Sequence, residues 1–135
     1  MFKYVKYGSG ARNYSNIIAI DVSGNDQIPT IESLVGTDLS NLKELNISNS
    51  SVTTLNHIPL QMKKLVAENV ALTSIIFHPD SLIEDIDLKG STITGNVSFD
   101  RLRNLKKLDL TNCVFNGNVT LANLESLTDF IISGA

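Results

Sequence analysis

The sequence contains no tryptophan, a single cysteine and no long run of apolar residues. One cysteine excludes an internal disulfide, so the chain is unlike the small secreted domains that several disulfides hold together. No stretch approaches the roughly 20 apolar residues that a membrane-spanning helix requires. Residues 1–16 also lack the apolar centre of a signal peptide. We therefore expect no membrane span, and these absences lean towards an intracellular protein.

The sequence also lacks an excess of basic residues, because its 14 acidic and 11 basic side chains give a net charge of −3. Non-specific binding of nucleic acid needs a dense basic surface, so we expect no nucleic-acid partner. The chain has no glycine-rich phosphate loop, no cluster of cysteine and histidine at metal-ligand spacing and no nucleophile elbow. The sequence therefore predicts no enzyme activity, no metal and no cofactor.

A repeated pattern runs through most of the 135 residues. The segment LKKLDLTNCVF at 105–115 matches LKELNISNSSV at 42–52, MKKLVAENVAL at 62–72 and IEDIDLKGSTI at 83–93. Two further copies begin at Ile17 and Leu127, and successive copies are 20–25 residues apart. Their central apolar residues are Ile20, Leu45, Leu65, Ile86, Leu108 and Phe130. A fixed period of this length indicates a repeat protein built from stacked units.

Within the L-x-x-L-x-L part of each copy, the last three positions alternate apolar, polar and apolar, which is typical of a strand with one buried face. A strand this short is unstable alone. Stacking the copies pairs each strand with the next in a parallel ladder, and the inward apolar side chains then form one continuous core.

The L-x-x-L-x-L register, followed by a position that holds asparagine or cysteine, resembles the leucine-rich repeat family over about residues 17–132. The resemblance implies an α/β solenoid, a right-handed curved stack with a parallel sheet on its concave face and mostly irregular connectors on its convex face. It divides the chain into an amino-terminal cap at 1–16 and a repeat domain at 17–135 with about six repeats. The last repeat is incomplete and has no carboxyl-terminal cap. A short helix is expected in the connector at 29–42.

Cys113 lies where the family places an inward-pointing asparagine or cysteine that satisfies backbone groups of the turn. Its equivalents are Asn25, Ser50, Val70 and Ser91, and we assign all five positions a structural role. A buried structural thiol fits this position better than a catalytic nucleophile, because His57 and His78 fall in the connectors of other repeats.

The resemblance places the binding surface on the outward strand residues. Charged, polar and lone apolar side chains gather there, with Asp87 and Asp109 as expected neighbours. Either the repelling carboxylates favour a cation or a basic residue of a partner, or Lys89 and Lys107 between them leave a solvated surface. The candidate binding residues are Lys64, Val66, Glu68, Asp85, Asp87, Lys89, Lys107, Asp109, Thr111, Asp129 and Ile131.

The sequence therefore predicts a non-catalytic module that binds a protein or peptide on the concave face, since mixed charge suits protein recognition. The alternative is a structural segment that self-associates through the uncapped edge of its last repeat, because an exposed strand edge invites pairing.

Overall fold

The computed structural model describes residues 4–7, 17–27 and 41–134, and these ranges form a β-solenoid of stacked parallel strands. None of the described residues lies in a helix. The expected α/β leucine-rich repeat solenoid is therefore wrong, since within the described ranges the chain returns between sheet strands through short strands and turns. The short helix expected at 29–42 lies outside the described residues, apart from residues 41 and 42, which are not helical.

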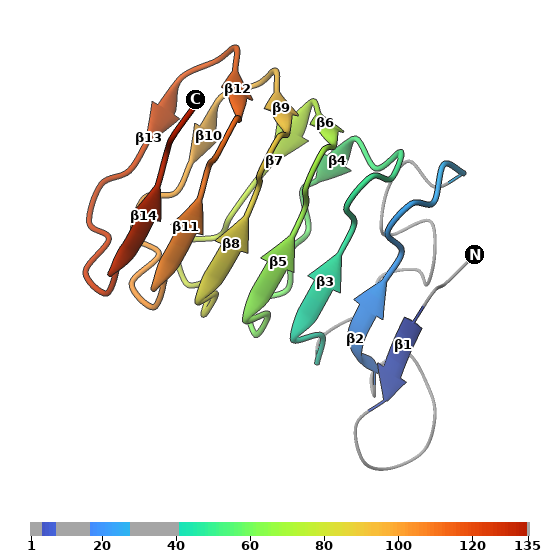
Figure 1. Cartoon of the computed structure of the whole chain (residues 1–135). Coiled ribbons are helices and arrows are strands. Elements are labelled where there is room, and N and C mark those ends of the chain that lie inside the picture. The colour runs from blue at the N-terminus through green and yellow to red at the C-terminus, as the bar shows by residue number, and fades with distance from the viewer. Residues whose placement is uncertain (1–3, 8–16, 28–40, 135) are drawn as a thin grey trace.

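One seven-stranded sheet runs the length of the molecule (Figure 1). Its strand order is β1-β2-β3-β5-β8-β11-β14, so each strand after β2 is added beside the one from the preceding coil. The strands are β1 (Tyr4–Tyr7), β2 (Ile17–Asp21), β3 (Glu44–Asn46), β5 (Lys64–Val66), β8 (Asp85–Asp87), β11 (Lys107–Asp109) and β14 (Asp129–Ile131).

The parallel ladder predicted from the repeat is confirmed. From β2 to β14 all pairs are parallel, and the register aligns one inward residue of every coil. The aligned residues are Ile20, Leu45, Leu65, Ile86, Leu108 and Phe130. Identical register at every step keeps the buried face of each strand on the same side.

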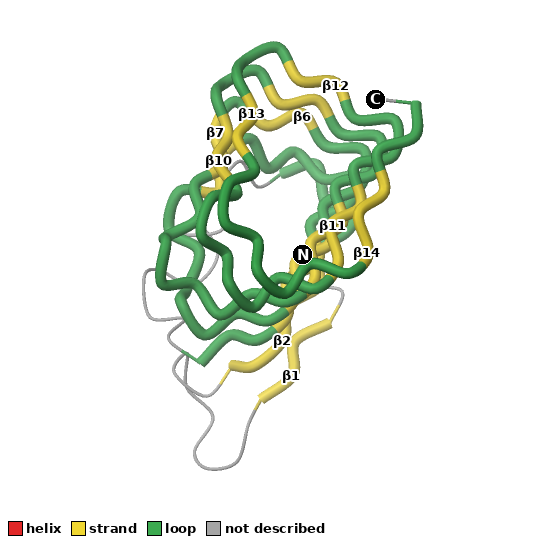
Figure 2. Tube along the Cα trace, turned by 90° about the vertical axis from the view of Figure 1, so that its left-hand side faces the viewer, coloured by secondary structure: helices red, strands yellow, loops and turns green. Residues whose placement is uncertain are grey.

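The connectors also form parallel ladders, which corrects the expectation that they are mostly irregular. Three small sheets run along the other sides of the coil (Figure 2). The first pairs β4 (Thr54–Leu55) with β7 (Ser74–Ile75), and the second pairs β9 (Thr92–Ile93) with β6 (Ala71–Leu72) on one side and β12 (Val114–Phe115) on the other. The third pairs β10 (Val97–Ser98) with β13 (Val119–Thr120).

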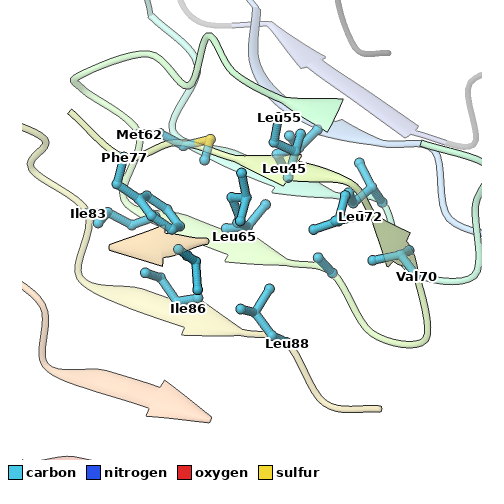
Figure 3. Packing of buried hydrophobic residues seen from close by; sticks show 14 of the residues in the cluster. Leu45, Leu55, Met62, Leu65, Val70, Leu72, Phe77, Ile83, Ile86 and Leu88 are labelled. Carbon is cyan, nitrogen blue, oxygen red and sulfur yellow. The ribbon is translucent and has the colours of Figure 1, made fainter. Parts of the chain in front are cut away.

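The core lies between these walls and is mostly aliphatic, and Figure 3 shows part of it. Leu65, Ile86 and Leu108 from the main sheet are all completely buried. Connector residues face them across the coil, and the rings of Phe77 and Phe99 stack with centroids 5.6 Å apart. Since each coil contributes only a few core residues, burial depends on the coils above and below.

A left-handed residue turns the chain after each sheet strand. The residues with positive φ at this position are Gly24, Asn49, Asn69, Gly90, Asn112 and Gly134. Glycine and asparagine are the two residue types that adopt this conformation most readily. At Gly90 the turn is doubly restricted, because a Cβ atom there would also press directly against Oδ1 of Asn69 in the preceding coil.

The two ends of the sheet differ. At the amino-terminal end, β1 pairs antiparallel with β2. Only residues 4–7 of the cap predicted at 1–16 are described, so the cap stays a prediction. At the other end, Phe130 occupies the core register of β14 and is 43% exposed, whereas Leu108 in the coil before it is completely buried.

The core assignment predicts a large loss of stability when Leu108 is changed to alanine. We expect Leu108→Ala to lower the free energy of unfolding by about 2–5 kcal/mol, because it leaves a cavity between packed coils. The matched control is Ile76→Ala, at a connector position that is 54% exposed, where we expect a loss below about 1 kcal/mol. Chemical denaturation measures both, and equal losses would contradict the assignment.

Candidate functional site

The outward face of the seven-stranded sheet, hereafter the sheet face, carries most of the residues that the sequence assigned to binding. Because side chains alternate along a strand, the register stacks equivalent outward residues into columns across the coils. Each predicted binding residue on a strand therefore has a neighbour at the same position in an adjacent coil, and the chemistry of the face depends on which residues these columns bring together.

One column alternates in charge from coil to coil. The register places Lys64 between Glu44 and Asp85, and it places Lys107 between Asp85 and Asp129. Opposite charges directly across a strand pair stabilise the sheet, whereas like charges destabilise it. This column therefore favours the observed register, and four of the predicted binding residues contribute to it beside the unassigned Glu44.

A second group of charges lies at the start of the strands. The carboxylate of Glu84 lies 3.4 Å from Nζ of Lys63 and 3.7 Å from Nζ of Lys106. These side chains are 37–64% exposed, so each pair contributes little to stability. Glu84 offsets part of the positive charge of this group, which remains basic.

Four predicted binding residues meet around a single ammonium group. Nζ of Lys89 lies 3.5 Å from Glu68, 3.4 Å from Asp87 and 3.7 Å from Asp109. Asp87, followed by Glu68, raises the pKa of Lys89. The close carboxyl of Asp87 and partial burial raise the pKa of Glu68, although Lys89 acts against this shift. Three carboxylates around one lysine leave the group acidic.

The acidic column is the strand position that holds Asp87 and Asp109, and its side chains bind backbone amides. The sequence did not lead us to expect this role. The side-chain Oδ1 accepts a hydrogen bond from the amide N–H of the residue two positions later, at 2.8–3.0 Å, in Asp21, Asn46, Asp87 and Asp109. These side chains stabilise the turn that leaves each strand. Asp109 is 5% exposed and also accepts the hydroxyl of Thr111 at 2.6 Å. The signal in the sequence was aspartate or asparagine at the same position in four of the six copies.

Val66 occupies this position in its coil and cannot accept a hydrogen bond. The amide of Glu68 donates instead to Oγ of Ser48 in the preceding coil, at 3.0 Å. Ser48 is 7% exposed, so the substitute acceptor is largely shielded from water. The solenoid therefore satisfies the same backbone amide from a different coil.

Of the five turn positions that were assigned a structural role, all except Val70 carry a side chain that contacts backbone groups. Oγ of Ser91 donates to the carbonyl of Ala67 at 2.5 Å and accepts the amide of Val70 at 3.1 Å. The hydroxyl thus serves the coil in which valine provides no polar group. Oδ1 of Asn25 accepts the amide of Gln27, and Oγ of Ser50 accepts the amide of Val52.

The thiol of Cys113 lies inside the stack. Its Sγ is 2.8 Å from the carbonyl oxygen of Leu88, and the residue is 2% exposed. Burial raises the pKa of the thiol to about 11, and Asp109 and Asp87 add to this shift. A thiol of this kind stays protonated at neutral pH, which makes it a poor nucleophile.

A hollow of about 200 Å³ opens on the sheet face over β2, β3 and β5. Ala19 and Val66 give it small apolar walls, and Lys64 supplies an ammonium group. Asp21, Glu44 and Asn46 line it too, although the sequence analysis did not select them. The signal that could have identified the hollow is the small side chain of Ala19 in a column of long charged ones.

The predicted binding residues therefore separate into groups. Lys64 and Val66 line the hollow, while Glu68, Asp87, Lys89 and Asp109 together form the acidic group. Thr111 is engaged with Asp109. Asp129 and Ile131 lie on β14, where both are exposed.

Within the described ranges, no three acidic, histidine or cysteine residues are arranged to hold a metal ion. No helix in that part of the chain is long and apolar enough to cross a membrane. Comparisons with protein-family models, curated proteins and solved structures found no match to this chain.

The turn-stabilising role of Asp109 is testable by substitution. Asp109→Ala leaves the Thr111 amide without its acceptor, and we expect a loss of about 1–3 kcal/mol in the free energy of unfolding. Asp109→Asn retains an oxygen acceptor, as Asn46 does in its own coil, so we expect a smaller loss. Equal losses would contradict a role for the acceptor.

The pH dependence separates the charge of Asp109 from its hydrogen bonds. Burial acts to raise its pKa, but the Thr111 hydrogen bonds, Lys89 and Lys107 outweigh burial and lower it. The charged form therefore stabilises the fold above the unfolded pKa, and this contribution is lost as pH falls through the lower folded value. Denaturation below about pH 4 should bring wild type and Asp109→Asn closer together.

Proposed function

We propose that this protein is a non-catalytic module that binds a protein or peptide through its sheet face. The observation that carries the proposal is the hollow over β2, β3 and β5, with apolar walls at Ala19 and Val66 and charged groups around them. An apolar pocket edged by a few polar groups suits one side chain of a partner, with neighbouring charges fixing its orientation.

The pairing of charges on the sheet face supports a protein partner. Lysines and carboxylates alternate across the coils, so a peptide crossing the strands meets both signs within a short distance. Mixed charge of this kind contributes specificity for a complementary protein surface. The L-x-x-L-x-L register supports a relationship to leucine-rich repeat proteins, which bind ligands on the corresponding strands.

The hollow predicts which substitution removes binding. Peptides selected from a random displayed library against the wild-type protein should bind Val66→Arg at least about tenfold more weakly, because the larger side chain fills the hollow. Ile76→Arg is the matched control, since Ile76 is 54% exposed on a connector and lies outside the hollow. Selected peptides that bind both variants equally would contradict the proposed surface.

A second candidate function is self-association through β14, and a specific exposed surface favours it. Phe130, Ile131 and Ile132 are 38–51% exposed at the last strand. The first sheet edge is already paired with β1, so a head-to-tail stack on β2 is blocked. We propose that two copies meet through their β14 edges about a twofold axis, which makes the shared strand pair antiparallel.

This contact predicts a concentration-dependent mass. Light scattering over a wide concentration range should show dimers of the wild-type protein, and Ile132→Lys should shift the equilibrium towards monomer by placing a charge at the apolar contact. Ile76→Lys provides the matched control and should leave the mass unchanged. A wild-type protein that stays monomeric at every concentration would exclude this candidate.

A further inference from the structure

A second cavity lies away from the hollow, between the turns that lead into β8 and β11. These two strands are neighbours in the sheet (Figure 1). It measures about 300 Å³ and is lined by residues 79–82 of one coil and by Arg101, Arg103 and Asn104 of the next. This volume matches the lower end of small-molecule sites. The cavity is therefore large enough to hold a small ligand between two coils.

Two of the three arginines in the chain line this cavity. The seven lysines of the described ranges are elsewhere, on or next to the sheet strands. The coil that follows carries Asn123 and Glu125 at the positions equivalent to Arg101 and Arg103. The repeat itself therefore does not require a cation at either position.

The backbone conformation of Arg101 strengthens this point. Arg101 has φ 64° and its equivalent, Asn123, has φ 60°, so the same left-handed turn occurs in both coils. Asparagine tolerates this conformation, whereas arginine adopts it only with backbone strain. Asparagine would fit this turn better than arginine, so the geometry of the turn does not explain why arginine occurs there.

The acidic groups nearby leave both guanidinium groups available. Asp100 attracts Arg101, but Oδ1 of Asp100 accepts the amide of Ala122 at 2.7 Å, and that bond is the largest cause of its lowered pKa. In the described part of the chain, no ion pair includes Arg101 or Arg103. Asp80 lines the cavity, with its side chain 81% exposed and Oδ2 3.9 Å from Nδ1 of His78.

We propose that this cavity binds a small molecule through an oxyanion group, either a phosphate or a carboxylate, held by Arg101 and Arg103. The guanidinium group is planar and matches both oxyanions with paired hydrogen bonds. Asn104 adds an amide donor to the lining. Ser81 accepts the amide of Ile83 through Oγ at 3.3 Å and keeps its own proton to donate. Leu82, which is 41% exposed, offers an apolar surface to the rest of the ligand.

The probes are inorganic phosphate and acetate, each titrated at constant ionic strength while amide chemical shifts are recorded by NMR. The wild-type protein should show saturable shifts centred on residues 79–82 and 101–104. Tighter binding of phosphate assigns the site to phosphorylated ligands, and tighter binding of acetate assigns it to carboxylates. The absence of saturable binding of either probe overturns the proposal.

The variants are chosen so that loss of folding cannot imitate loss of binding. Arg101→Asn removes the guanidinium and suits the left-handed turn, so we expect an unchanged or higher melting temperature together with at least about tenfold weaker binding. Arg103→Gln should weaken binding similarly. Equal affinity of Arg101→Asn and the wild-type protein overturns the proposal.

Two further variants separate a local site from the general attraction between charges. Lys64→Gln removes one positive charge from the sheet face and should leave the affinity unchanged. Asp80→Asn removes the carboxylate that opposes an anion in the cavity, so the affinity should rise about threefold or more. If Lys64→Gln weakens binding as much as Arg103→Gln does, the anion is attracted by overall charge and the proposal is wrong.

Discussion

The structure depends on lateral hydrogen bonding between backbones that keep one register from the first coil to the last. The amides of Asn49, Asn69 and Asn112, which follow the sheet strands, donate to carbonyls of the next coil just as the strand residues do. Backbone groups inside a protein must be paired, so a change in register at one place propagates around the coil. This constraint explains why the turns repeat left-handed glycine or asparagine and why small polar residues repeat inside them.

The parts of the fold that sequence reasoning predicted are those with a repeated side-chain signal. Leu45, Leu65 and Ile86 each follow a polar residue at fixed spacing, and that pattern determined both the strands and their register. The connector strands were missed because pairs such as Thr92–Ile93 are too short to show a period of two. The expected α/β class came from the family resemblance, and the short helix expected at 29–42 came from Thr30, Glu32 and Ser33, which are typical of a helix start.

The candidate site was less predictable, because the same residue types serve the fold and the surface. Asp109 looked like part of an acidic binding column, yet its carboxylate accepts the backbone and hydroxyl of Thr111. Ser48 replaces the acceptor that Val66 lacks, and this relation between two coils has no signature within either repeat. The hollow at Ala19 likewise depends on three strands meeting, so it could be located only once the coils were stacked.

The alternating charge column has a consequence for how this chain can change in length. Neighbouring coils carry opposite charges in this column, which holds Glu44, Lys64, Asp85, Lys107 and Asp129. A coil therefore packs well only beside a coil whose residue in the column has the opposite charge. Copying a single coil within the stack would place two like charges directly across a strand pair, which is unfavourable. Copying two adjacent coils together would preserve the alternation. In electrostatic terms the building block of this solenoid is a pair of coils, although its sequence period is one.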